Sequence, residues 1–104
     1  MSLTVETRKT ATATLVKVAG EVDVSNAAEL RSALDAALAD GAAAIQVDLA
    51  DVPYIDSTGI GVLVGTAHRA RDKGASRVVA NPQRNVARVL DLLGVGAELN
   101  VRKA

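Results

Sequence analysis

The segment from Asp56 to Gly61, DSTGIG, places an acid, two hydroxyls and two glycines directly before an aliphatic run. Such a segment could carry a nucleophile, hold a phosphate with its backbone, or begin a helix. A nucleophilic Ser57 would need a base close by, and the chain has one histidine, His68. Eleven residues of one helix would separate the two by roughly 16 Å, far beyond hydrogen-bond reach. We therefore predict no catalysis by Ser57 and no enzyme activity.

Nucleotide-binding motifs match this segment poorly. Gly59 and Gly61 have the G-x-G spacing, but the third glycine of a dinucleotide fingerprint would stand at Val64, and the next glycine is Gly65. No Walker lysine follows the segment. The nucleophile elbow G-x-S-x-G fails as well, because Ile55 occupies its first glycine position. We expect no nucleotide or other cofactor.

Asp48, Asp51 and Asp56 follow one another closely, and carboxylates are ligands for hard metal ions. Aspartates in a loop after a strand more often cap helices and form turns. The chain also has no cysteine, so thiolate ligands and disulfides are excluded. We predict no metal.

The overall charge and composition exclude two classes of partner. Twelve basic and twelve acidic side chains cancel, so no net field draws the chain to nucleic acid or to an anionic membrane. Tyr54 is the single aromatic residue, whereas base-stacking surfaces need several. No apolar run approaches the roughly 18 residues that span a bilayer, and no signal-peptide pattern begins the chain. We expect a cytoplasmic protein with no direct nucleic-acid contact and no membrane insertion.

Hydrophobic periodicity in the first half predicts a hairpin from residues 4–8 and 11–18, a turn at 20–24, and a helix that ends at Gly41. Ser25 or Asn26 is expected to cap this helix, with Glu29 completing a capping box. Residues 45–49 then alternate between apolar and polar side chains, which predicts a strand with one packed face. Since a parallel strand covered on both faces would be almost continuously apolar, the helices should lie mainly on one face.

The second half repeats strands and helices. A helix is predicted over residues 57–73, a strand over 77–80, a third helix with Asn81 as cap and Pro82 as its first residue, and a last short strand within 95–101. The inward stripes should be Ile60, Leu63, Val64, Ala67 and Ala70 on the second helix, and Val86, Val89, Leu90 and Leu93 on the third. This order predicts one α/β domain with an N-terminal hairpin and a mixed, mostly parallel sheet.

Two interpretations of Ser57 remain open on these residues. Its hydroxyl could cap the second helix, as serine often does. It could instead be an exposed hydroxyl that is phosphorylated, because a helix N-terminus favours a phosphate and a phosphate changes the local charge by about −1.5 to −2. The two interpretations are compatible with each other.

The order of three motifs resembles STAS domains, and particularly bacterial anti-sigma factor antagonists. The motifs are residues 48–63 with the DSTGIG segment, the GEVD loop at 20–23, and the segment 82–94. The resemblance extends from about residue 4 to 99, which indicates a single STAS domain over 1–104. It implies a small β-α superhelix in which Ser57 starts the second helix.

The resemblance also implies partners and a switch. Ser57 would be phosphorylated by a partner that is both an anti-sigma factor and a serine kinase. The unphosphorylated antagonist would bind that partner, phosphorylation would end the binding, and a PP2C-type phosphatase would restore it. Thr58 is a second candidate hydroxyl, and Asp56 would orient the hydroxyl or the neighbouring backbone. The partner-binding surface implied by the family comprises Glu21, Asp23, Asp56, Thr58, Gly59, Ile60 and Gly61.

A second role is open within the same fold: a STAS subunit that serves a membrane lipid transporter or a signalling scaffold. The same surface would then contact an ATPase or a scaffold subunit, and Ser57 need not be phosphorylated. A small nucleotide-binding enzyme is the least supported class, because the motifs above are incomplete.

Overall fold

The computed structural model describes residues 3–102, so the ends of the expected 1–104 domain lie outside the described residues. Its elements, in chain order, are β1 (Thr4–Lys9), β2 (Thr14–Ala19), α1 (Ala27–Ala39), β3 (Ala44–Asp51), α2 (Ser57–Asp72), β4 (Ser76–Ala80), α3 (Arg84–Leu92), α4 (Gly96–Leu99) and β5 (Val101–Arg102). The strands form one sheet in the order β1-β2-β3-β4-β5. β1 is antiparallel to β2 and the other pairs are parallel. The predicted mixed α/β sheet with an N-terminal hairpin is confirmed.

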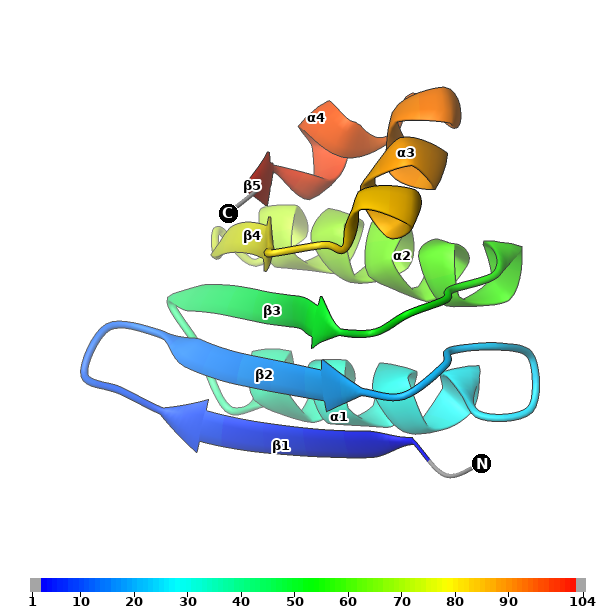
Figure 1. The fold of residues 1–104 in the computed structure, drawn as a ribbon. Coiled ribbons are helices and arrows are strands. Elements are labelled where there is room, and N and C mark those ends of the chain that lie inside the picture. The colour runs from blue at the N-terminus through cyan, green and yellow to red at the C-terminus, as the bar shows by residue number, and fades with distance from the viewer. Residues whose placement is uncertain (1–2, 103–104) are drawn as a thin grey trace.

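The long helices cover one face of this sheet, as the alternation in residues 45–49 predicts. α1 and α2 both run behind the sheet in Figure 1, and α3 and α4 lie at the β4–β5 end. The helix-facing positions of β2 and β3 are buried: Thr14, Val16, Val18, Ile45, Val47 and Leu49. The alternate positions line a hollow on the opposite, uncovered face: Leu15, Lys17, Gln46 and Asp48.

The core is almost entirely aliphatic. Its largest fully buried side chains include Leu30 and Leu34 of α1, Leu49 of β3, Leu90 of α3 and Leu99 of α4. Each such side chain contributes about 1.5–3 kcal/mol when it is removed from water. Four helices and the sheet therefore share one core, and α2 packs between α1 on one side and α4 on the other.

The start of α1 differs from the predicted capping box. Asn26 occupies the N-cap position, but its side chain makes no capping hydrogen bond. It is buried, and its amide ties the preceding loop together instead: Oδ1 accepts from the Asp23 N–H at 3.0 Å and Nδ2 donates to the Glu21 carbonyl at 2.9 Å. The capping prediction was wrong because the Asn26 amide forms these hydrogen bonds within the loop and not with the first turn of the helix.

The third helix begins later than predicted. Pro82 is not its first residue, since α3 starts at Arg84 with Gln83 as N-cap. Asn81 adopts a left-handed conformation, with φ of 57°, and its N–H donates to the Arg102 carbonyl at 2.8 Å. Asn81 is therefore held by β5, which prevents it from capping a helix.

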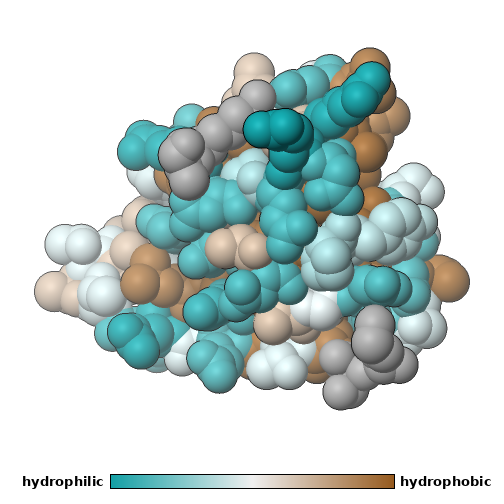
Figure 2. All heavy atoms as spheres, viewed as in Figure 1, coloured by the Kyte–Doolittle hydropathy of each residue, from teal (hydrophilic) through white to brown (hydrophobic). Residues whose placement is uncertain are grey.

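This shift changes which α3 side chains are buried. Val86 and Leu90 are buried as predicted, but Val89 and Leu93 are 38% and 55% exposed, and Leu92 is 77% exposed. Figure 2 shows the resulting apolar surface at the upper right, over the end of α3. The predicted tail strand is mostly the short helix α4, whose Leu99 fills the core, followed by the two-residue β5.

The second helix matches its prediction closely. α2 ends at Asp72, one residue earlier than expected. Four of its five predicted inward residues are buried, while Val64 is half-buried and Thr66 is buried in addition. Thr66 tolerates burial because its hydroxyl donates to the Val62 carbonyl of the preceding turn at 2.9 Å.

Candidate functional site

Two loops that continue β2 and β3 lie side by side and lead to the start of α2. Val22 pairs with Ile55 in an isolated parallel bridge. The Val22 N–H donates to the Tyr54 carbonyl, and the Asp56 N–H donates to the Val22 carbonyl, both at 3.0 Å. The bridge therefore places the loop that contains Glu21 next to the first turn of α2.

Asp56 is the N-cap of α2. Its backbone is extended, with φ of −93° and ψ of −179°, and its Oδ1 accepts from the Gly59 N–H at 3.0 Å. Its carbonyl accepts the first helical hydrogen bond, from the Ile60 N–H, at 3.0 Å. The prediction that Ser57 caps the helix was therefore wrong, because the adjacent carboxylate makes that contact.

Ser57 is the first helical residue, and both it and Thr58 are exposed. The first turn of α2 contains no acidic residue, whereas Arg69 and Arg71 occupy its last turn. A phosphate on the Ser57 oxygen would meet the positive end of the helix dipole, which contributes about 0.3–1 kcal/mol at an exposed site. The hydroxyl is accessible to a modifying protein without any opening of the fold.

The two glycines of the segment have different roles. A Cβ at Gly59 would lie 2.7 Å from Cγ1 of both Val22 and Ile55, so this position requires glycine for close packing. A Cβ at Gly61 would meet nothing within 4 Å, so packing does not require glycine there. Gly59 and Ile60 are buried, so their side-chain positions face the core.

Asp23 lies in the loop beside this helix start. Its Oδ1 accepts hydrogen bonds from the Ser25 hydroxyl and from the Ser25 N–H. These bonds favour the charged carboxylate, and the pKa of Asp23 is therefore lowered, mainly by the hydroxyl. The loop keeps a negative charge close to Ser57 at neutral pH.

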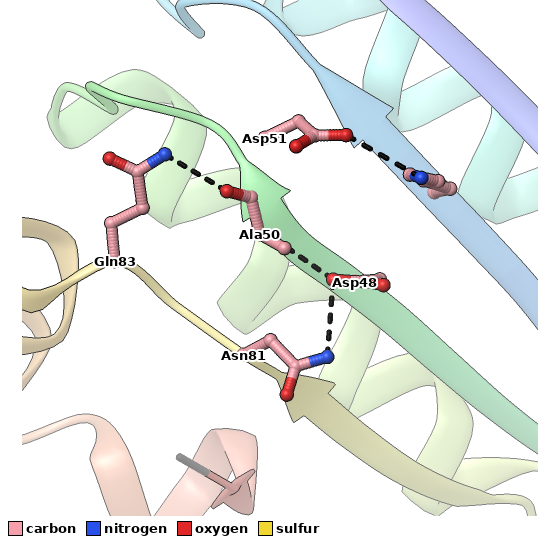
Figure 3. A network of polar contacts seen from close by, with 6 residues as sticks. Asp48, Ala50, Asp51, Asn81 and Gln83 are labelled. Carbon is pink, nitrogen blue, oxygen red and sulfur yellow. Dashed lines mark hydrogen bonds and ion pairs between the residues drawn. The ribbon is translucent and has the colours of Figure 1, made fainter. Parts of the chain in front are cut away.

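Side chains near α3 fix the loop that precedes Asp56, and the sequence interpretation did not identify them. Gln83 Nε2 donates to the Ala50 carbonyl at 2.9 Å, and Asn85 Nδ2 donates to the Pro53 carbonyl at 2.7 Å. Gln83 is drawn in Figure 3 reaching across to Ala50. The only signal in the sequence was the pair of amide side chains on either side of Arg84, which has no distinctive spacing.

The aspartates considered as metal ligands make separate protein contacts. Asp48 Oδ1 accepts from the Ala50 N–H at 2.9 Å and from Asn81 Nδ2 at 3.4 Å, while Asp51 pairs with Lys17 at 3.5 Å (Figure 3). Asp56 is engaged as the cap. Within residues 3–102 no group of three or more acidic, histidine or cysteine side chains could hold a metal ion.

His68 lies on the same helix as Ser57, as the distance argument assumed. Its Nε2 contacts Oε1 of Glu98 on α4. The only imidazole is thus held against α4.

None of the helices in residues 3–102 has the length and apolar character that crossing a membrane would require.

The family model for the STAS domain matches residues 4–104. The chain belongs to the STAS domain family. The anti-sigma-B factor antagonist of Bacillus subtilis (strain 168) is 36% identical over 95 residues, which cover 91% of this chain and 86% of the relative. The resemblance on which the sequence interpretation relied is confirmed.

Two solved structures share the fold of this STAS domain. An anti-sigma factor antagonist from Mycobacterium paratuberculosis superposes with a TM-score of 0.90 at 24% identity, covering 99% of this chain and 87% of that one. The Bacillus cell fate determinant SpoIIAA in its phosphorylated form gives 0.76 at 19% identity, covering 99% and 91%. At these identities the likeness establishes the fold, including the β-α arrangement around α2.

The capping role of Asp56 in this STAS domain predicts a difference between two neighbouring substitutions. Asp56→Ala removes the acceptor for the Gly59 N–H and should lower the free energy of unfolding by about 1 kcal/mol. Ser57→Ala removes no capping bond and should change it by less than about 0.5 kcal/mol. Urea denaturation of the two variants measures both values, and equal destabilisation would contradict the assignment of the cap.

The lowered pKa of Asp23 predicts a pH effect in the same STAS domain. Ser25→Ala should raise the pKa of Asp23 towards its ordinary value, because the main hydrogen bond to the carboxylate is lost. A lowered folded pKa stabilises the fold above the unfolded pKa, and this contribution disappears as the pH falls through the folded pKa. NMR titration of the Asp23 carboxyl carbon in both proteins checks the direction. An unchanged midpoint would assign the shift to another cause.

Proposed function

We propose that this STAS protein is an anti-sigma factor antagonist that is switched off by phosphorylation at Ser57. In its unphosphorylated form it binds an anti-sigma factor and so frees the sigma factor. The relative from Bacillus subtilis, an anti-sigma-B factor antagonist that aligns with most of the chain, supports the role. The observation that carries the switch is the exposed Ser57 hydroxyl immediately after a cap that Asp56 provides.

Phosphorylation at this position would change the surface and preserve the fold. The phosphate adds about −1.5 to −2 charges close to Asp56 and the acidic loop at Asp23, and it takes no capping bond away. A partner that fits the unphosphorylated surface would then have to bury a doubly charged group. The loss of binding follows from that desolvation and from repulsion by any acidic group that faces it.

Exposed apolar side chains near Ser57 suit a protein partner. Val24 is 77% exposed and Tyr54, the only aromatic residue, is 49% exposed. They belong to the two loops that the Val22–Ile55 bridge holds together. Aromatic residues commonly dominate the binding energy of interfaces. We therefore add Val24 and Tyr54 to the proposed partner-binding surface, whose other exposed or half-buried members are Glu21, Asp23, Asp56, Thr58 and Gly61.

The partners we propose are an anti-sigma factor that is itself a serine kinase and a PP2C-type phosphatase that removes the phosphate. Both would act in the cytoplasm, where the sigma factor meets RNA polymerase. The chain itself would supply the substrate hydroxyl, because its single imidazole, on His68, is held against α4.

The test combines binding with phosphorylation. The purified chain is incubated with each anti-sigma factor kinase of the same genome and ATP, and the products are mapped by mass spectrometry. One kinase should bind the chain and add a single phosphate at Ser57, and Thr58→Ala should leave the reaction intact. Phosphate on Thr58 alone, or binding by no anti-sigma factor, would refute the proposal. Recovery of transporter subunits alone would favour the other STAS role.

A further inference from the structure

The outer edge of β1 is the long free edge of the sheet. β1 stands at one end of the strand order and pairs with β2 along its inner side only, from Thr4 to Lys9. The opposite end of the sheet is β5, which has two residues. An unpaired edge of six residues is a template for another strand.

Two opposite charges stand next to each other on this edge. Glu6 and Arg8 are both exposed, and they share one face of β1 because side chains alternate along a strand. Within residues 3–102 neither has an ion-pair partner, although Lys17 stands across from Glu6 on β2. An edge strand whose side chains carry charges of one sign repels the same strand of a second copy. The opposite charges of Glu6 and Arg8 cause no such repulsion.

We propose that β1 pairs antiparallel with β1 of a second copy of this chain, with Thr7 on the two-fold axis. This register places Glu6 opposite Arg8 of the second copy, and Arg8 opposite Glu6, so that both unpaired charges gain a partner. Val5 then lies across from the aliphatic stem of Lys9, and Thr7 across from itself. Directly opposite charges and threonine pairs are both favourable cross-strand neighbours.

The helix behind β1 leaves room for the second copy. A groove between α1 and the hairpin runs beside the free edge and is lined by Thr7, Lys9, Thr14, Ala33, Ala36, Ala37 and Asp40. Ala33 is half-buried and Ala36 is exposed, so α1 presents small side chains there. The ion pair between Lys9 and Asp40 holds the end of β1 against α1. The second copy can therefore approach the edge without a clash from α1.

An interface of this size should be weak. A standard stable interface involves some 20–30 residues a side, and this one uses a single strand, so we expect a dissociation constant on the order of 100 µM. The proposed site around Ser57 remains uncovered in each copy. It lies beyond the carboxyl ends of β2 and β3 and not along the edge of β1 (Figure 1).

Sedimentation equilibrium of the full chain, from about 10 µM to about 1 mM, tests the pairing. The weight-average molecular mass should rise with concentration towards that of a dimer. Glu6→Arg and Arg8→Glu should each weaken association at least tenfold, and the double swap should restore it. Arg88→Glu, an exposed reversal on α3, is the matched control and should have no effect. A monomer at the highest concentration, equal dimerisation by the single swaps, or no recovery in the double swap would overturn the proposal.

A cysteine variant gives a second measurement that does not depend on charge. The chain has no cysteine, and residues directly opposite across an antiparallel pair have Cβ atoms about 4.5–5.5 Å apart. Thr7→Cys should therefore form a disulfide-linked dimer under mild oxidation much faster than Thr12→Cys, which lies in the exposed hairpin turn. Equal rates for the two variants would also overturn the pairing. Circular dichroism confirms that each variant is folded.

Discussion

Ser57→Asp is expected to weaken binding of the anti-sigma factor by about thirtyfold or more. The carboxylate would occupy an exposed position at the start of α2, next to the bridged loops that present Val24 and Tyr54. A partner that packs over this surface would bury an unpaired charge, which typically costs 2–5 kcal/mol, and about 1.4 kcal/mol corresponds to a tenfold change in affinity. Isothermal titration calorimetry with the kinase identified above measures the difference.

Two matched variants separate charge at this site from other effects of the substitution. Ser57→Ala should bind within about threefold of the unmodified chain and should accept no phosphate, because it removes a hydroxyl that makes no capping bond. Ser32→Asp places the same charge on an exposed serine of α1 and should bind normally. Full binding by Ser57→Asp would show that negative charge at this position does not control the complex.

Gly59→Ala is expected to lower the free energy of unfolding by about 1–3 kcal/mol. The added methyl group would lie 2.7 Å from side-chain carbons of Val22 and Ile55, and overpacking of a buried site typically has this cost. The clash falls on the two residues whose bridge holds the loops together. We therefore expect the affinity for the anti-sigma factor to fall in the same variant, although the glycine itself is buried.

Gly61→Ala is the matched control, two residues later on the same helix. A methyl group there meets no atom within 4 Å, and alanine is a better helix former than glycine by roughly 0.5–1 kcal/mol. Thermal and urea denaturation should show Gly61→Ala to be more stable than the unmodified chain and Gly59→Ala to be less stable. The same sign for both variants would contradict the packing described here.

The parts of the fold that sequence predicted well are those with a strong local period. The alternation of Ile45, Val47 and Leu49 with polar residues correctly indicated a sheet with helices on one face. Helix α3 was predicted less well, because Asn81-Pro82 is a good helix start in isolation. A distant partner, the Arg102 carbonyl, holds Asn81 in another conformation, and a local pattern contains no information about it.

At the candidate site, too, the local sequence pattern does not decide the role of individual residues. Asp56 and Ser57 are both good capping residues, and their order along the chain does not say which one caps. The bridge between Val22 and Ile55 decides, since it keeps Asp56 extended and starts the helix at Ser57. Likewise, Gly59 and Gly61 look equivalent in sequence, and the positions of the Val22 and Ile55 side chains distinguish them.

The cap at Asp56 has a consequence for how the proposed switch would be reset. Because the Asp56 carboxylate, and not Ser57, accepts from the Gly59 amide, we expect this bond to persist after phosphorylation and the amide hydrogen exchange to be equally slow in both states. No refolding step then separates the two states, and the same molecule can pass through many cycles without exposing its core. The lifetime of each phosphorylation state would then depend only on the activities of the proposed kinase and phosphatase.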